Sequence, residues 1–217
     1  MATFEVSGLE AGYGRARVLF GVSLQAGAGE VVALLGRNGA GKSTTLKAVI
    51  RLVQASAGEV RLDGARIDGL ETHDIARLGV AYVPEERRIF TDLTVAENIA
   101  VGRQAPRPGA PEWTDERLNA LFPALAPMAR RRAGTLSGGE QQMLCIARSL
   151  AGNPRAILLD EPSEGLAPII VEQVAQAILG MKQAGVAVLL AEQSRAFSRR
   201  VADRSYTLEK GRIADGQ

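Results

Sequence analysis

The sequence predicts an α/β fold in which a mostly parallel sheet is covered by helices on both faces. Three apolar runs, at residues 30–35, 156–159 and 186–190, predict buried strands. Amphipathic stretches at 42–53 and 168–183 predict the helices between them. Strands this uniformly apolar occur where both faces of a parallel sheet are buried, and their alternation with helices is typical of doubly wound proteins.

Two further regions have a different character. Residues 1–30 and 59–68 contain short alternating segments separated by glycine turns, which predicts an antiparallel sheet. Residues 95–151 look almost wholly helical, apart from a loop at 103–111 that holds three prolines. We interpret the helical stretch as an insertion into the α/β core, because no linker separates it from the flanking segments.

The chain is therefore expected to form one domain of 217 residues. Residues 1–88 and 147–217 would form the α/β core with its antiparallel part, and residues from about 89 to 146 would form the helical part. A sizeable core is possible, because at this length folding buries about 70% of the surface of the unfolded chain.

Composition excludes several functional classes. Apolar residues make up 46% and charged residues 23%, and the net charge of +2 gives no electrostatic case for a nucleic-acid partner. Cys145 is the only cysteine, so an intrachain disulfide is excluded. The chain begins without a signal pattern and has no apolar run of about 20 residues, the length that spans a membrane.

A phosphate-binding loop is predicted at residues 36–44, where GRNGAGKST fits the pattern G-x-x-x-x-G-K-[ST]. The loop follows a predicted strand and opens a predicted helix, so backbone N–H groups and the helix N-terminus can face a phosphate. Lys42 is expected to reach the β- and γ-phosphates of a nucleotide, and Ser43 to ligate Mg²⁺. The remaining contacts are expected from Gly36, Asn38, Gly39, Gly41 and Thr44.

Two carboxylates, Asp160 and Glu161, follow the predicted strand at 156–159. Ligands of open α/β sheets bind at the carboxyl ends of the strands. Beside a P-loop, Asp160 is placed to hold Mg²⁺ through water, and Glu161 to accept a proton from the attacking water. Phosphoryl transfer needs mainly positioning and charge neutralisation, so this pair suffices. Without a P-loop, the same pair is an ordinary polar strand end.

A third motif, LSGGEQQ at residues 136–142, opens another predicted helix. Ser137 is a good N-cap, and Glu140 stands three residues further on, as in a capping box. Gly138 and Gly139 weaken the helix but expose backbone N–H groups, as an anion site requires. The motif fits a capped helix as well as an anion site.

These three motifs, in this order, resemble the ATP-binding subunit of an ATP-binding cassette (ABC) transporter over essentially the whole chain. The resemblance implies a RecA-like P-loop NTPase core with an N-terminal antiparallel β subdomain and an inserted helical subdomain. It also implies that two cassettes pack head to tail, with each ATP between one subunit's P-loop and the other's signature motif. Ser137, Gly138 and Gly139 would then serve the nucleotide of the partner.

The resemblance extends to finer features. Tyr13, in a glycine turn, matches the aromatic residue that stacks on adenine. One subgroup is similar in more detail: the ATP-binding subunits of branched-chain amino acid importers, with relatives thought to serve urea or short amides. The matching segments are AYVPE (81–85), LTVAEN (93–98), EPSEGLAP (161–168) and AEQ (191–193).

Three positions depart from most cassettes. Glu85 stands where most have a glutamine that senses the metal and the γ-phosphate. Ala167 replaces an aspartate that links the two subunits, and Gln193 replaces a switch histidine. Gln193 can hydrogen-bond a γ-phosphate but cannot carry a positive charge. These changes suggest that this chain's own site is slow and that it works as a heterodimer with a second cassette, a homodimer being the alternative.

The resemblance implies an ATP hydrolase that uses ATP and Mg²⁺, with Glu161, Gln193 and Lys42 as catalytic residues. It would power import of branched-chain amino acids, or of a related small polar solute, through transmembrane permease subunits. A solute-binding protein would deliver the solute to these subunits. Such a subunit lies in the cytoplasm, peripheral to the membrane. Two alternatives stay open: a nucleotide-gated switch with little hydrolysis, which Gln193 and Ala167 favour, and a soluble ABC ATPase outside transport.

Other conspicuous residues are interpreted as structural. Cys145 is expected to be a small buried hydrophobe, and Trp113 a packing residue. His73 is expected on the solvent face of a helix. The arginine runs at 130–132 and 199–200 are expected on solvated faces.

Overall fold

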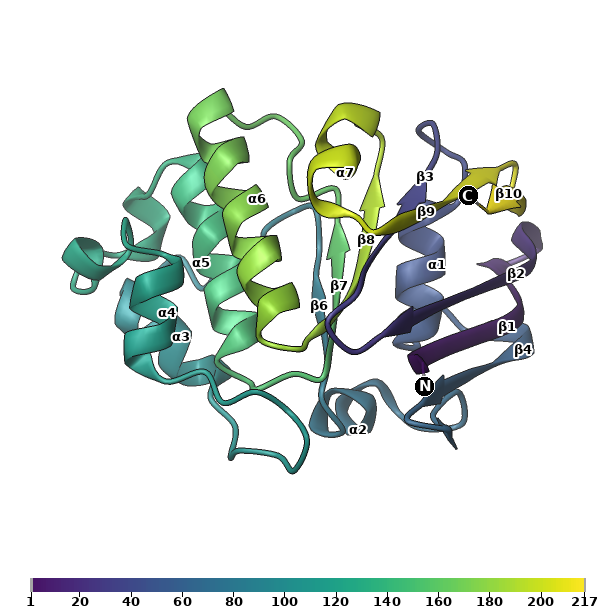
Figure 1. The fold of residues 1–217 in the computed structure, drawn as a ribbon, viewed down its shortest axis with the longest axis horizontal. Helices are drawn as coiled ribbons and strands as arrows, with labels where there is room; N and C mark the ends of the chain where they lie inside the picture. The colour runs from purple at the N-terminus through teal and green to yellow at the C-terminus, as the bar shows by residue number, and fades with distance from the viewer. Residues whose placement is uncertain (1, 217) are drawn as a thin grey trace.

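The computed structural model describes residues 2–216 and places two sheets side by side, with helices packed around them (Figure 1). The smaller sheet is antiparallel and has the order β2-β1-β4-β5. Its strands are β1 (Ala2–Tyr13), β2 (Ala16–Gly27), β4 (Ala55–Leu62) and β5 (Ala65–Arg66). Buried and exposed residues alternate along the second half of β2, so one face of this sheet is covered. The predicted antiparallel region is confirmed.

The larger sheet has six strands in the order β10-β9-β3-β8-β7-β6. They are β3 (Val31–Leu35), β6 (Val80–Val83), β7 (Ala156–Asp160), β8 (Ala187–Glu192), β9 (Arg204–Glu209) and β10 (Arg212–Gly216). All neighbours from β9 to β6 pair in parallel, and β10 joins the edge in the antiparallel sense. Every residue of β3, β7 and β8 is buried, which explains the three uniformly apolar runs.

Four helices flank the parallel strands in the chain, and the first two of them lie on the connections to and from the smaller sheet. They are α1 (Lys42–Val49), α2 (Thr72–Arg77), α6 (Pro168–Gln183) and α7 (Arg195–Val201). Helix α6 has the predicted limits and begins with proline, which lacks an N–H that the first turn would leave unpaired. The prediction for α1 was too long, because Arg51 adopts a left-handed conformation with φ of 60° and ends the helix.

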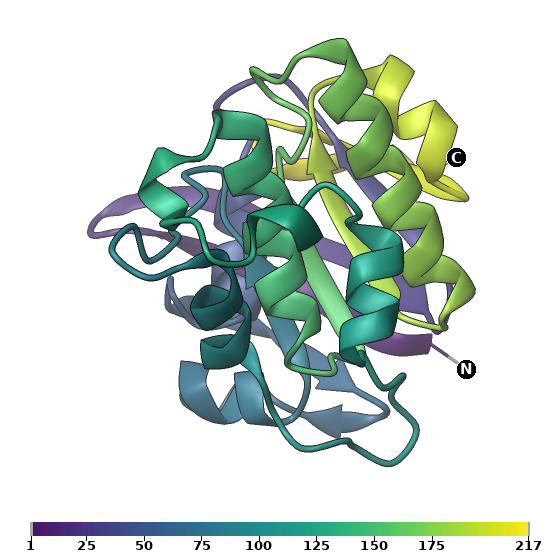
Figure 2. The ribbon, with the colours of Figure 1, turned by 90° about the vertical axis from the view of Figure 1, so that its left-hand side faces the viewer.

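The helical part contains α3 (Val95–Gly102), α4 (Asp115–Leu121) and α5 (Gly138–Leu150). Figures 1 and 2 show these helices on the side of the molecule away from β1 and β2. The prediction of a nearly continuous helical region was wrong between α4 and α5. There the chain forms only two short 3₁₀ turns, η1 (Ala126–Met128) and η2 (Ala133–Thr135), because Pro123 and Pro127 have no N–H for a helix. The predicted loop at 103–111 is confirmed.

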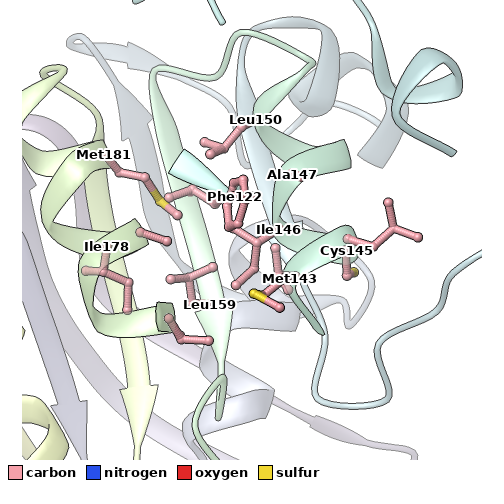
Figure 3. Close-up of a cluster of buried hydrophobic side chains, with 14 of the residues drawn as sticks. Phe122, Met143, Cys145, Ile146, Ala147, Leu150, Leu159, Ile178 and Met181 are labelled. Carbon is pink, nitrogen blue, oxygen red and sulfur yellow. The ribbon is translucent and has the colours of Figure 1, made fainter. Parts of the chain in front are cut away.

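Two hydrophobic cores lie on opposite faces of the larger sheet, because successive residues of a strand point to opposite sides. Leu159 of β7 belongs to the core under the helical part, whereas the preceding Leu158 belongs to the core around α1 and the antiparallel sheet. Figure 3 shows Leu159 between Ile146 of α5 and Ile178 of α6. Helices α5 and α6 are thereby held against the strand whose end carries Asp160.

The residues that were interpreted as structural lie in the core or on the surface as predicted. Cys145 and Trp113 are buried in the helical-side core, and burial raises the pKa of the Cys145 thiol. His73 lies on α2 with 65% of its side chain exposed. The runs 130–132 and 199–200 are mostly exposed.

The topology brings four loops to one edge of the larger sheet. Parallel strands β3, β6, β7 and β8 all end at this edge. The segments that follow them are the P-loop at 36–44, the turn with Glu85, the pair 160–161 and the pair 192–193. The fold therefore gathers at one edge residues that are far apart in the sequence, where ligands of open α/β sheets bind.

Candidate active site

The P-loop between β3 and α1 depends on two glycines. Gly41 has φ of 110°, and a Cβ at this position would lie 2.9 Å from the side chain of Leu19. A Cβ at Gly36 would lie 2.6 Å from the carbonyl oxygen of Leu208. A side chain is excluded at Gly41 by the positive φ and by packing, and at Gly36 by contact with the backbone. The glycines of the motif therefore shape the loop itself.

Lys42 folds back into the P-loop. Its Nζ donates to the carbonyl oxygens of Gly36, at 2.9 Å, and Arg37, at 3.3 Å. The same Nζ lies 2.9 Å from Oε1 of Glu161, and both side chains are more than 90% buried. Two of the predicted catalytic residues thus form a direct ion pair at the mouth of the loop.

Asp160 is held by hydroxyl groups from two different elements. Ser43 Oγ donates to Oδ1 at 2.8 Å, and Tyr82 of β6 donates its hydroxyl to Oδ2 at 2.9 Å. Burial raises the pKa of Asp160, and both hydrogen bonds oppose that rise. Burial, reinforced by the charge of Asp160, also raises the pKa of Tyr82. Sequence reasoning missed Tyr82, since only the pairing of β6 with β7 brings it to this carboxylate.

The Ser43–Asp160 pair suits a magnesium ion that arrives with a nucleotide. Among residues 2–216, no group of three or more His, Cys, Asp or Glu side chains could hold a metal ion on its own. Mg²⁺ is typically bound through one or two carboxylates together with substrate phosphates. A hydroxyl and a carboxylate oxygen 2.8 Å apart are hard oxygen donors of the right kind. The donor set fits magnesium completed by phosphate oxygens.

A cavity of about 430 Å³ opens in front of the P-loop. Its lining residues are Val18, Asn38, Gly39, Gly41, Lys42, Ser43, Thr44, Glu85, Glu161 and Glu164. Glu85 is thereby placed beside the P-loop. Gln193 lines a neighbouring cavity with Gly36, Asn38 and Gly39, and a further one with Glu161. Tyr13 lines none of these cavities. It is 52% exposed and lies at the end of the β1–β2 hairpin, and Val18 of the same hairpin lines the cavity in front of the P-loop.

The signature motif forms the capped start of α5. Ser137 Oγ accepts from the Glu140 N–H, and Glu140 Oε2 accepts from the Ser137 N–H at 2.7 Å, which confirms the predicted capping box. A Cβ at Gly138 would lie 2.5 Å from Nη1 of Arg87, and one at Gly139 would lie 2.8 Å from the side chain of Ile170. Ser137, Gly138 and Gly139 line none of the three cavities described above. Their part in nucleotide binding stays a prediction.

Glu164 is an acidic residue of the cavity that sequence reasoning did not assign. A hydrogen bond to Glu161 and the charge of that carboxylate raise the pKa of Glu164 to about 7. A carboxyl group beside a carboxylate keeps its own proton to higher pH, because ionisation would place two like charges next to each other. The only sequence signal was its position three residues after Glu161.

Glu164→Gln is expected to stabilise the nucleotide-free protein at alkaline pH. The folded state keeps a proton that the unfolded state loses between pH 4.5 and about 7, so the unfolding free energy of the wild type falls across that window. The variant lacks this loss, so its unfolding free energy is expected to exceed that of the wild type by an amount that grows from pH 4.5 to about 7 and then stays constant. Because Glu164 is largely exposed, the gain is expected to be below about 1 kcal/mol. Urea unfolding at several pH values measures it.

Glu116→Gln is the matched control for Glu164→Gln. Glu116 accepts a hydrogen bond from the Thr114 side chain, which lowers its pKa, so its stabilising effect is lost as the pH falls. The two variants are therefore expected to change stability with opposite dependence on pH. Equal pH profiles for wild type and Glu164→Gln would contradict the raised pKa of Glu164.

A comparison with known proteins decides the family. The sequence profile described as "ABC transporter" matches residues 19–164, which include the P-loop, the signature motif and the Asp160–Glu161 pair. The chain belongs to the ABC transporter family. The resemblance inferred from the three motifs is confirmed.

Curated members of the ABC transporter family cover most of the chain. The high-affinity branched-chain amino acid transport ATP-binding protein BraG of Pseudomonas aeruginosa is 45% identical over 93% of this chain and 86% of its own length. A probable branched-chain amino acid transport ATP-binding protein, LivF of Archaeoglobus fulgidus, is 36% identical over 95% and 88%. The lipopolysaccharide export system ATP-binding protein LptB of Escherichia coli K12 is also 36% identical, over 98% and 89%.

Solved structures of ABC transporter cassettes have the same fold. An ATP-binding cassette of an ABC transporter in its ADP conformation superposes with a TM-score of 0.84 at 25% identity, covering 100% of this chain and 91% of that one. A dimeric cassette in a post-hydrolysis state, bound to ADP and Pi, has a TM-score of 0.82 at 26% identity over 99% and 97%. The predicted RecA-like fold with its β and helical parts is confirmed.

This ABC transporter family member is thus an ATP-binding subunit and an ATP hydrolase. Within residues 2–216, the structure contains no helix long and apolar enough to cross a membrane.

Proposed function

We propose that this chain is the ATP-hydrolysing subunit of an importer for branched-chain amino acids or a related small polar solute. The solute class is supported by the 45% identity to the branched-chain amino acid transport protein of Pseudomonas aeruginosa. Hydrolysis by this chain is supported above all by one contact, the buried ion pair of Lys42 with Glu161 at the mouth of the P-loop.

Nucleotide binding would rearrange this ion pair. The phosphates of ATP compete with the Gly36 carbonyl and with Glu161 for the Lys42 ammonium. When Lys42 turns to the β- and γ-phosphates, the Glu161 carboxylate is released to orient the attacking water and to accept its proton. Gln193 then hydrogen-bonds the γ-phosphate from the neighbouring strand end.

The remaining site residues would hold and sense the nucleotide. Ser43 and Asp160 would hold Mg²⁺, which neutralises the charge that develops on the phosphates. Tyr13 would stack on the adenine, since its exposed ring lies at the end of the hairpin beside the P-loop. Glu85 would sense the γ-phosphate at the wall of the cavity. Ser137 and its two glycines would serve the nucleotide of a second cassette.

The proposed assembly joins this chain to a second ABC ATPase subunit and to transmembrane permease subunits. A groove of about 610 Å³ between α2, β6 and the helical part supports permease docking, and its walls include the exposed side chains of Phe90 and Val101. Docking there would place the chain at the cytoplasmic face of the membrane without a span of its own. A solute-binding protein would act on the permease, not on this chain.

The heterodimer and the switch alternative rest on the same two departures. Ala167 is the N-cap of α6, and its methyl side chain has no polar atom, so it cannot supply the link between subunits that the resemblance assigns to an aspartate at this position. Gln193 is neutral. Both favour a slow site that needs a second, different cassette, and at the extreme a nucleotide-gated switch. The Lys42–Glu161 pair favours hydrolysis over the switch. The 36% identity to LptB makes export the second candidate for the transport role.

Uptake of radiolabelled leucine by cells of the source organism tests the proposal. Deletion of the gene is expected to reduce uptake, the wild-type gene to restore it, and a gene with Glu161→Gln to leave it reduced. Normal leucine uptake in the deletion strain, combined with loss of lipopolysaccharide from the cell surface, would support export instead. Restoration by Glu161→Gln would support a switch that acts without hydrolysis.

A further inference from the structure

A buried acid next to the active site takes no part in the mechanism so far. Glu192 is the last residue of β8, and only 1% of its surface is exposed. Burying a carboxylate is costly unless hydrogen bonds replace its hydration. Near a site that binds the phosphates of ATP, a further negative charge also weakens anion binding. A residue with both costs calls for a compensating role.

Three donors satisfy the Glu192 carboxylate, and they come from two loops. Oε1 accepts from Ser163 Oγ at 2.6 Å and from the Ser163 N–H at 3.2 Å. Oε2 accepts from the Ser194 N–H at 3.2 Å. Each oxygen is therefore tied to a different segment of the chain. Burial raises the pKa of Glu192, and all three hydrogen bonds oppose that rise.

The two loops are those that carry the proposed catalytic residues. Ser163 lies two residues after Glu161, and Ser194 directly follows Gln193. Ser194 is also the N-cap of α7, where its hydroxyl accepts from the Phe197 N–H, so the second loop is anchored to a helix. One carboxylate thus connects the loop of the proposed general base to the loop of the proposed γ-phosphate sensor.

The first loop needs such an anchor because its backbone is strained. Glu161 has φ of 45°, a left-handed conformation that a residue with a side chain adopts at a cost. Strain of this kind persists only where surrounding contacts hold it. The Glu161 N–H donates to the Ala191 carbonyl at 2.9 Å, and the bonds from Ser163 to Glu192 secure the loop on its other side.

We infer that Glu192 is a positioning residue for ATP hydrolysis, whose carboxylate clamps the Glu161 loop and the Gln193 loop in register. This inference rests on the proposed roles of Glu161 and Gln193. When ATP draws Lys42 away, the Glu161 side chain loses its ion-pair partner, and the clamp keeps its backbone in place. The clamp acts through Glu161 and Gln193 and does not touch the nucleotide.

Glu192→Gln separates positioning from simple packing. An amide has the shape of a carboxylate but only one acceptor oxygen, whereas the two arms of the clamp use different oxygens. If the amide oxygen stays beside Ser163, the Ser194 N–H loses its acceptor. If the oxygen turns to Ser194, the Ser163 N–H loses its acceptor and only the Ser163 hydroxyl, which can also accept, keeps a hydrogen bond. Single-turnover hydrolysis of MgATP, with the full chain in excess, is expected to slow by between about 10- and 100-fold. The dissociation constant of a fluorescent ATP analogue is expected to change less than about twofold, because the clamp does not touch the nucleotide.

Ser163 offers a second test that does not alter the buried charge. Ser163→Ala removes the 2.6 Å hydrogen bond from the hydroxyl to Glu192 and is expected to lower the hydrolysis rate, as Glu192→Gln does. Ser163→Thr keeps the hydroxyl and is expected to hydrolyse ATP at the wild-type rate. In a Glu161→Gln background, Glu192→Gln is expected to cause no further loss of the residual rate. Residues that act through one another are not additive.

The outcomes separate the clamp from the proposed function. If Glu161→Gln hydrolyses ATP at the wild-type rate, the role of Glu161 is wrong. If Glu161→Gln is inactive but Glu192→Gln and Ser163→Ala turn over normally, the clamp alone is wrong. Equal losses of nucleotide binding and rate in Glu192→Gln, with no rescue by Ser163→Thr, would show a structural role only. Should Glu192→Gln fail to fold, the Ser163 pair decides.

Discussion

Glu161→Gln is expected to lower the turnover of MgATP by at least about 100-fold while the protein still binds the nucleotide. The glutamine keeps the size and the hydrogen-bonding carbonyl of the side chain but cannot accept a proton from the attacking water. Lys42 keeps its contacts with the carbonyl oxygens of Gly36 and Arg37, so the P-loop is expected to stay intact. Phosphate release measures turnover, and a fluorescent ATP analogue measures binding.

Glu172→Gln is the matched control. Glu172 lies on the exposed face of α6, where it pairs with Arg200 and contacts Gln176, so the same chemical change is expected to leave turnover unaffected. Wild-type turnover in Glu161→Gln would mean that the proton is accepted elsewhere. Turnover too slow to measure in both the wild type and Glu161→Gln would favour the switch.

The hydrolysis-deficient variant also tests the assembly. With saturating ATP, a closed pair of cassettes should persist in Glu161→Gln, and light scattering gives its mass. Twice the 23.0 kDa of the chain would show that it pairs with itself, against the proposed heterodimer. A persistent monomer with ATP bound would support the need for a different cassette.

Lys42→Ala is expected to have the second large effect, on both activity and stability. Loss of the ammonium would remove the donor that is proposed to face the transferred phosphoryl group, so turnover is expected to drop by about 100- to 1000-fold. It also leaves the Glu161 carboxylate buried without its cation, at 8% exposure. Breaking a buried pair from one side is expected to lower the free energy of unfolding by about 3 kcal/mol.

Denaturant unfolding without nucleotide measures the stability of Lys42→Ala, with Lys182→Ala as its control. Lys182 pairs with Asp203 at the surface, where its loss is expected to cost less than about 1 kcal/mol and to leave turnover unchanged. Unchanged stability of Lys42→Ala would indicate that Glu161 is solvated as soon as the lysine is gone. Unchanged turnover would contradict the role of the P-loop lysine.

Local sequence patterns predicted much of this fold and site. The glycines of the P-loop and the capped start of α5 are short-range features, because the backbone conformation that each requires is written in adjacent residues. The buried strands were visible because both of their faces are covered. The end of α1 was not visible, since Arg51 ends the helix in a left-handed conformation that arginine does not signal.

Contacts between segments distant in the sequence needed the tertiary structure. Sequence alone placed Lys42, Asp160 and Glu161 in one site, because strand ends carry ligands in such sheets. It did not show that Lys42 rests on Glu161 or that Tyr82 holds Asp160, since both contacts depend on which strands are neighbours.

The sequence by itself determined the family and predicted the residues proposed for its nucleotide chemistry, because motifs of this kind depend on residue types at fixed short spacings. Only the tertiary structure decided how those residues restrain one another: Glu192 joins two loops through Ser163 and Ser194, and Glu161 raises the pKa of Glu164. The physical reason is that hydrogen bonds and charge coupling act over a few ångströms, and the pairing of β7 with β8 brings Glu192 that close to the loop of Glu161.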